Sequence, residues 1–381
     1  MALPCHWPKA LAFFILTPMK HFVAGSFFPI LMSFLSACAM AGPSQGPKSE
    51  YALGTVCTIN LYDAGRPALY SSAFARLREL EEIFSANRED SDLARVNRNA
   101  GLRPVTVRPE LIEVLSRALE FAEKSGGLYD PAIGPLVKLW GIGTGNEQVA
   151  GNEEISEALA LVNYREIEIN RQEGTVFLNR PGMALDLGAI AKGYAADEIV
   201  KLLAGKGVER AIIDLGGNIF AKGGKKQEKN ITGFIKKIFS GKAKQENADG
   251  FWRIGVQDPR EHRGDYLGIL ELKNKTIVTS GIYERYFEKD GVRYHHIFSV
   301  ENGFPAETGL LSVTIVADRS IDADALSTAA FVMGWERGRE LIASIPGAEG
   351  IFVFDDLAVR TTAGLENCFT LIASDYFQEK Q

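Results

Sequence analysis

The sequence predicts a globular protein that contains both helices and strands. In residues 51–62, apolar and polar side chains alternate and Val, Thr and Ile are frequent, which is typical of a strand. The apolar residues of 67–84 have the spacing of an amphipathic helix. Between 252 and 317, several short strand-like segments follow one another. The hydrophobic content of 46% and the charged content of 24% are ordinary for a globular domain, and the formal net charge of −6 argues against nucleic acid as a partner.

The other elements are predicted from local patterns and from boundary residues. Asp90-Ser91-Asp92 is expected to cap a short helix, residues 126–143 to form a loop punctuated by Gly and Pro, and residues 184–194 to pass from a strand into a helix. Further helices are expected at 109–125, 152–161, 322–334 and 335–345. Hairpins are expected at 167–178 and 350–361, a strand interrupted by glycines at 211–221, and strands at 252–257, 268–272, 276–281, 291–299 and 311–317.

The N-terminus has the layout of a lipoprotein signal over residues 1–38. Met19-Lys20-His21 supplies positive charge, residues 22–34 are apolar, and Leu35-Ser36-Ala37-Cys38 resembles a lipobox whose cysteine is lipidated. Met19 is a possible true start, because residues 19–38 alone have normal signal proportions. An ordinary cleaved signal or a short membrane anchor is the alternative. The small residues of 39–49 suggest a flexible tether, followed by one domain over 50–375.

Two regions of the domain differ from their surroundings. Residues 225–250 are rich in Lys, Gly, Gln and Asn and are predicted to be a surface insertion, which contacts either solvent or anionic lipid. Cys57 and Cys368 lie in apolar runs, where two lone thiols or a disulfide between them would fit. Beyond the N-terminal signal, the sequence contains no run long enough to span a membrane.

The helix predicted at 322–334 carries polar groups although it is apolar nearly all round. Asp324 and Thr328 are four residues apart and therefore share one face. A buried carboxylate needs a cation or a donor, and two oxygen ligands one turn apart suit Mg²⁺. The alternative is an N-cap, in which Asp322 or Asp324 accepts helix N–H groups.

Three further stretches are candidates for binding or catalysis. Residues 186–194 combine Gly and Ala with Asp186 and Lys192 at a helix start, which favours phosphate or, alternatively, tight packing of the helix on a sheet. His295 and His296 point to opposite faces of a strand, so one can be a general base and the other structural. The loop that begins at Tyr129-Asp130-Pro131 can line a planar ligand or act as a rigid connector.

Taken together and in this order, these segments resemble the FAD:protein FMN transferase family (ApbE). The resemblance covers nearly all of residues 50–370 and implies an α+β fold with mixed and antiparallel sheets, helices and a flavin cleft. The matching stretches are Leu53-Gly54-Thr55, 91–97, 130–141, 186–194, 214–218, Thr279-Ser280-Gly281, His295-His296-Ile297 and 323–329.

The resemblance also implies a reaction and a set of site residues. FMN would move from FAD to a threonine of a target flavoprotein, AMP would be released, and His296 would take the threonine proton. Asp324 would bind Mg²⁺ together with Thr328 and the backbone carbonyl of Ala189. Asp324 is therefore expected to be catalytic as well as a metal ligand. The residues expected to contact FAD are Leu53, Asn87, Tyr129, Asp130, Pro131, Asp186, Lys192 and Phe298.

The sequence departs from the family pattern in two places. Ser299-Val300 and Asn302-Gly303 stand where the family usually has Asp-Pro and Thr-Gly. Asn87 stands where many members have a tyrosine, and loss of that ring would remove stacking on FAD and admit water. We therefore hypothesise that the protein also hydrolyses FAD to FMN and AMP. The alternative function is a non-catalytic flavin carrier. Family members are often exported lipoproteins, so the chain is expected on a membrane facing the periplasm or cell exterior.

Overall fold

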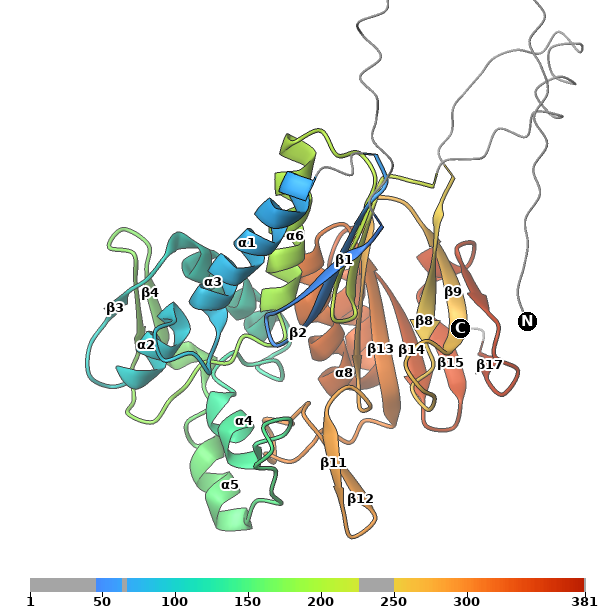
Figure 1. The fold of residues 1–381 in the computed structure, drawn as a ribbon. Coiled ribbons are helices and arrows are strands. Elements are labelled where there is room, and N and C mark those ends of the chain that lie inside the picture. Colours follow the sequence, from blue (N-terminus) through green and yellow to red (C-terminus); the bar gives the residue numbers. More distant parts are fainter. Residues whose placement is uncertain (1–45, 64–66, 226–249, 380–381) are drawn as a thin grey trace, which may run out of the picture. The chain divides into compact units, whose positions relative to one another are not determined.

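The structure is a computed structural model that describes residues 46–63, 67–225 and 250–379, which belong to one compact unit, Ala41–Gln381 (Figure 1). The predicted signal with Cys38, most of the predicted tether and most of the predicted insertion lie outside the described residues.

A nine-stranded sheet forms the centre of the fold. Adjacent strands of this sheet are antiparallel, except for the last two, which are parallel. The predicted α+β class with mixed and antiparallel sheets is therefore confirmed. In spatial order the strands are β1 (Lys48–Ala52), β2 (Thr55–Leu61), β6 (Ala211–Leu215), β7 (Asn218–Lys222), β10 (Lys275–Gly281), β13 (Leu310–Ala317), β14 (Glu349–Phe354), β15 (Ala358–Thr361) and β17 (Phe377–Gln378).

Each face of this sheet has its own hydrophobic core, because successive side chains of a strand point to opposite faces. Phe352 of β14 packs into the core beneath the helices, whereas its neighbours Ile351 and Val353 pack into the core on the other face. The helices of the first core are α1 (Pro67–Phe84), α3 (Pro109–Lys124), α6 (Ala191–Gly205) and α8 (Ser320–Ala343). The second core is closed by the small sheet β16 (Phe369–Leu371), β9 (Tyr266–Leu272) and β8 (Trp252–Gln257).

A third hydrophobic core gathers around Trp140. Trp140 contacts Tyr294 and Phe298, with ring centroids 5.6 and 5.9 Å away, and its indole N–H donates to the carbonyl of Gly303 at 2.9 Å. The remaining elements are α2 (Asp92–Arg98), β3 (Val105–Thr106), α4 (Gly134–Trp140), α5 (Asn152–Leu159), η1 (Tyr164–Glu166), β4 (Ile167–Asn170), β5 (Thr175–Leu178), β11 (Tyr286–Lys289), β12 (Val292–His295) and η2 (Ala363–Leu365) (Figure 1).

Most predicted helices and hairpins are confirmed. Helix α1 has the predicted bounds, and the side chain of Ser91 caps α2 by accepting the N–H of Ala94 at 2.9 Å. The two helices predicted on either side of Gly334 are continuous except at that glycine, whose φ of 71° and ψ of −176° are not helical. Cys57 and Cys368 are free thiols. In the described ranges, no helix is both long and apolar enough to cross a bilayer.

Several boundaries were wrong because turns were missed. The strand predicted at 51–62 is a hairpin that turns at Leu53 and Gly54, where φ is 54° and 71°. Its first strand begins at Lys48, so the end of the predicted tether is part of the sheet. The glycine interruption expected in the strand at 211–221 is a full turn, so this segment is two antiparallel strands, β6 and β7. The predicted loop 126–143 contains α4, and the strand predicted at 291–299 ends at His295 and pairs with β11, which was not predicted.

Candidate active site

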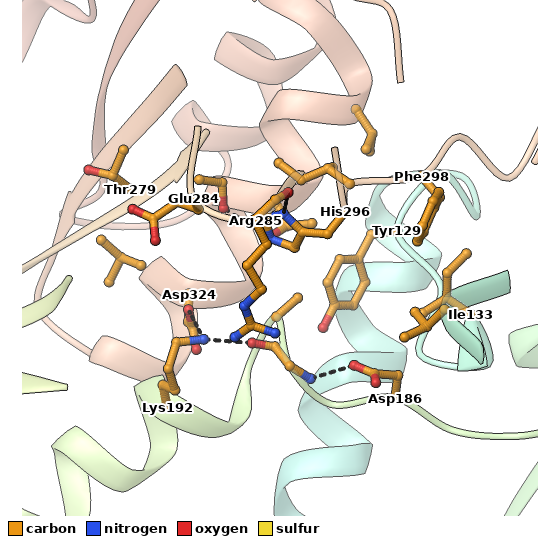
Figure 2. A pocket seen from close by; sticks show the side chains of 18 of the residues that line it. Tyr129, Ile133, Asp186, Lys192, Thr279, Glu284, Arg285, His296, Phe298 and Asp324 are labelled. Atoms are coloured by element: carbon orange, nitrogen blue, oxygen red, sulfur yellow. Dashed lines mark hydrogen bonds and ion pairs between the residues drawn. The ribbon is translucent and has the colours of Figure 1, made fainter. Parts of the chain in front are cut away.

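A cavity of about 330 Å³ opens where the ends of β10, α6 and α8 meet the loops around Asp130 and His296 (Figure 2). Most of the predicted site residues lie together in its wall. These are Tyr129, Asp130, Pro131, Asp186, Ala189, Lys192, His296, Phe298, Asp324 and Thr328. Leu53 and Asn87 are not among the lining residues. Leu53 packs against the main core, and Asn87 is exposed in the loop after α1.

Asp324 is almost fully buried, at 4% exposure, and it meets the donors that its burial requires. Its Oδ2 accepts the backbone N–H of Gly193 at 2.8 Å, and its Oδ1 lies 3.9 Å from the Nζ of Lys192. The alternative that Asp322 or Asp324 caps its own helix is wrong. Asp322 instead forms an ion pair with Arg117 at 2.8 Å, and the N–H that Asp324 accepts belongs to α6.

Thr328 lies one turn beyond Asp324 on the same face of α8, as the spacing predicted. Its Oγ1 is 3.0 Å from the Oγ of Ser280 on β10, which also lines the cavity. The cavity wall therefore holds a carboxylate oxygen and a hydroxyl oxygen from adjacent turns of one helix.

The segment before α6 is a compact turn rather than a strand. Ala184 makes only an isolated bridge to Ile133, and the helix begins at Ala191. The N–H of Gly188 donates to Asp186 Oδ1 at 2.8 Å, and Lys192 Nζ donates to the Gly188 carbonyl at 2.7 Å (Figure 2). This turn holds the Lys192 ammonium group at the cavity, next to Asp324.

His296 is oriented by a backbone carbonyl. Its Nδ1 lies 3.1 Å from the carbonyl oxygen of Arg285, and because a carbonyl can only accept, Nδ1 carries the proton (Figure 2). The Nε2 atom is then the acceptor. Burial, together with the charge of Arg285, lowers the pKa of His296 to about 3, so the ring is neutral at physiological pH.

His295 is the structural one of the two histidines, a choice that the strand pattern of the sequence did not decide. Its ring is buried and meets Phe331 edge-on, with centroids 5.9 Å apart, and its Nδ1 accepts the N–H of Ile297 at 3.3 Å. Burial lowers the pKa of His295 to about 4. The two histidines are thus separated into a buried structural ring and a ring that lines the cavity.

The loop at Tyr129–Pro131 is both a rigid connector and part of the wall. The carboxylate of Asp130 accepts the N–H groups of Ala132 and Tyr164 at 2.7 and 2.9 Å, and burial raises its pKa to about 6. The carbonyl of Pro131 accepts the N–H of Asp186 at 2.9 Å, which ties this loop to the turn before α6. The rigid connector is therefore confirmed, and the same residues form part of the cavity wall.

The model of the ApbE family matches residues 53–352 of the chain. The chain belongs to the ApbE family. The FAD:protein FMN transferase of Treponema pallidum is 40% identical over 87% of this chain and 91% of the relative, and one from Klebsiella pneumoniae is 34% identical over 80% and 88%.

Solved structures of ApbE proteins have the same fold. The crystal structure of the ApbE protein from Thermotoga maritima is similar with a TM-score of 0.71, at 31% identity, covering 84% of this chain and 98% of that chain. The flavin transferase ApbE from Vibrio cholerae is similar with a TM-score of 0.67, at 26% identity, covering 88% and 99%.

Three charged residues of this ApbE cavity were missed by sequence reasoning: Arg263, Glu284 and Arg285. A signal for Arg285 was present, because Asp290-Gly291 is the typical turn of a two-residue hairpin and both residues of that turn have positive φ. Recognising that hairpin would have paired β11 with β12 and placed Arg285 beside His296. Arg263 has no comparable local signal, since it comes from the loop between β8 and β9.

The cavity combines charges with an apolar wall. Lys192, Arg263 and Arg285 are cationic, which suits a phosphate-bearing ligand. Burial raises the pKa of Glu284, which faces these cations. Apolar side chains complete the wall at Ile133, Val137, Ile142 and Phe298. The arrangement can therefore hold a ligand that has both a planar apolar part and an anionic part.

Proposed function

We propose that this protein moves FMN from FAD onto a threonine hydroxyl of a target flavoprotein and releases AMP. It is a flavin transferase, like the relatives that share its family and most of its length. The observation that carries the proposal is that the oriented base His296 lines the same cavity as Asp324 and Thr328.

FAD matches the two parts of the cavity. Its pyrophosphate would lie among Lys192, Arg263 and Arg285, whose charges complement it. Its ring system would lie against Tyr129 and the apolar side chains near Phe298. This binding mode predicts that AMP and FMN each compete with FAD.

The cavity wall also offers oxygen atoms that suit Mg²⁺. Asp324 Oδ1 makes no hydrogen bond within the described residues, and it would bind the ion together with Thr328 Oγ1 and the carbonyl of Ala189. Among the residues that the structure describes, no three His, Cys, Asp or Glu side chains cluster as a metal site, so hydroxyl and carbonyl donors would complete the set. When bound, the ion would neutralise pyrophosphate charge.

The chain's own residues account for the proton transfer. The threonine hydroxyl gives its proton to Nε2 of His296, and its oxygen forms a bond to the phosphorus of the FMN half. The bond from that phosphorus to the bridging oxygen breaks, and AMP leaves with the bonding electron pair. The Arg285 carbonyl accepts the Nδ1–H throughout and so stabilises the imidazolium that forms.

Hydrolysis of FAD to FMN and AMP is the same reaction with water in place of threonine, and we propose it as a second activity. Its motivation is Asn87, where many family members have a tyrosine, although the exposed Asn87 does not line the cavity. Asn87→Tyr is expected to lower the rate of FMN and AMP formation in the absence of acceptor. An unchanged rate would contradict the hypothesis that Asn87 admits water to bound FAD.

The experiment that tests the transferase uses residues 39–381 with FAD and Mg²⁺, with and without a threonine-bearing target peptide, and follows products by mass spectrometry. An FMN adduct on the peptide, with AMP released, is the expected result. FMN and AMP without peptide would demonstrate hydrolysis. Intact bound FAD in both mixtures would support the flavin carrier instead.

We further propose that the protein is exported and anchored through a lipid on Cys38, on the strength of the signal-like residues 19–38. A single acyl chain gives only marginal membrane binding, so stable anchoring takes a second chain or another membrane contact. Cys38→Ser is expected to move the protein from the membrane fraction to the soluble fraction. Retention in the membrane fraction would favour an uncleaved anchor.

A further inference from the structure

Helices α6 and α8 approach each other closely near their N-termini. A Cβ atom on Gly193 would lie 2.2 Å from the carbonyl oxygen of Ser320, so only glycine fits there. Neither helix has a side-chain cap from its own N-cap residue, which is Ile190 in α6 and Arg319 in α8. Their N-terminal N–H groups must therefore find partners elsewhere.

Each helix supplies the missing acceptor to the other. Asp197 of α6 accepts the N–H of Ser320 through Oδ1 at 2.8 Å and the N–H of Ile321 through Oδ2 at 3.0 Å. Asp324 of α8 accepts the N–H of Gly193 through Oδ2 at 2.8 Å. Two carboxylates thus cap two helices reciprocally.

This reciprocal pair joins the two segments that carry the atoms of the proposed magnesium site. Asp324 and Thr328 lie on α8, whereas Ala189 lies just before α6, so their spacing depends on how the two helices are held together. The bond to Gly193 occupies Oδ2 of Asp324 and leaves Oδ1 at 3.9 Å from Lys192. Mg²⁺ demands near-ideal octahedral geometry, and functional groups must be held within about 0.5 Å.

We infer that Asp197 is a positioning residue, which sets the first turn of α8 so that Asp324 offers Oδ1 alone to the divalent cation. The inference rests on the proposed function, because it concerns that same ion site. Asp197 is not among the residues that line the cavity. It acts through the backbone of Ser320 and Ile321.

The test measures Mn²⁺ binding by electron paramagnetic resonance, in the absence of flavin. It uses residues 39–381 of the wild type, Asp197→Ala and Asp197→Asn. Asp197→Ala removes both acceptors, and the milder Asp197→Asn keeps one oxygen. Asp197→Ala is expected to weaken ion affinity by about 10- to 100-fold, which is the usual effect of losing a group that orients a metal-coordinating residue. Asp197→Asn is expected to weaken it by less. Saturating Mg²⁺ is expected to restore most of the transfer rate.

Asp63→Asn is the matched control. Asp63 also accepts two backbone N–H groups, those of Glu209 and Arg210, but it lies beyond the other end of α6 and does not line the cavity. Asp63→Asn is expected to bind Mn²⁺ as the wild type does, even if its melting temperature falls.

The outcomes separate this inference from the proposed function. Wild-type affinity in a folded Asp197→Ala or Asp197→Asn variant overturns the positioning role and leaves the ion site intact. Equal weakening in Asp63→Asn overturns it as well, because the effect would then be general destabilisation. A wild type that binds no Mn²⁺ overturns the ion site itself, together with the inference.

Discussion

The Nδ1–H of His296 donates to the carbonyl oxygen of Arg285 at 3.1 Å, and this single bond sets the tautomer of the ring. The hairpin of β11 and β12 makes the bond possible, because its pairing places residue 285 opposite residue 296. The same carbonyl also accepts the backbone N–H of His296 at 3.2 Å. The cavity thus holds a neutral imidazole whose Nε2 makes no hydrogen bond with any residue that the structure describes.

His296→Asn is expected to lower the rate of FMN transfer by about 10²- to 10⁴-fold, the usual contribution of a general base. FAD binding should persist, because the cationic residues are untouched. Single-turnover labelling of the acceptor, read by flavin fluorescence, measures the rate. A transfer rate close to that of the wild type would mean that another group takes the proton.

Thr328→Val is expected to raise the Mg²⁺ concentration for half-maximal activity by about tenfold or more, because the substitution keeps the shape and removes a proposed oxygen ligand. Activity titrations with Mg²⁺ after removal of metal by EDTA provide the measurement. Ser327→Ala is the control, since Ser327 also lies within hydrogen-bond distance of Ser280, at 2.8 Å, but does not line the cavity. Ser327 also donates to the backbone carbonyl of Asp324 at 2.9 Å, so equal shifts in both variants would assign the effect to the hydroxyl network around Ser280 and not to a lost ion ligand.

Gly193→Ala is expected to destabilise the fold by about 1–3 kcal/mol, since its Cβ would overlap the carbonyl of Ser320 and force the helices apart. Urea unfolding measures the change. Gly205→Ala is the matched control in the same helix, because nothing lies within 4 Å of its added Cβ, and it should be neutral or stabilising by about 1 kcal/mol or less. Similar losses in both variants would contradict the steric account.

His295 is expected to make stability depend on pH. Its folded pKa of about 4 lies below the usual value near 6.5, so the unfolded chain binds more protons in this window. The stabilisation is present above pH 6.5 and is lost as the pH falls through about 4. His295→Gln should remove roughly 2–3 kcal/mol of this dependence.

Guanidinium chloride unfolding of both proteins between pH 4 and 7 tests this prediction. Asp130 and Asp197, whose folded pKa values of about 6 are raised, have the opposite slope, because their contribution is present below about pH 4 and is lost as the pH rises through 6. Both carboxyls are present in wild type and variant, so the difference between the two curves isolates His295. Parallel curves would show that His295 is not the cause.

The sequence by itself determined what depends on near neighbours along the chain. The bounds of α1, the Ser91 cap of α2 and the shared face of Asp324 and Thr328 follow from the helical repeat and from hydrogen bonds that span three or four residues. Ten positions that the resemblance to the ApbE family implied as site residues lie in the cavity wall.

The tertiary structure decided which groups those residues meet. The donor to Asp324 is Gly193, 131 positions away, and the acceptor for His296 comes from across a hairpin whose turn the sequence reasoning missed. It also left Leu53 and Asn87 out of the cavity wall. Such contacts depend on how helices and strands pack, and periodicity specifies only which face of an element is buried. The partner of that face is set by the whole chain.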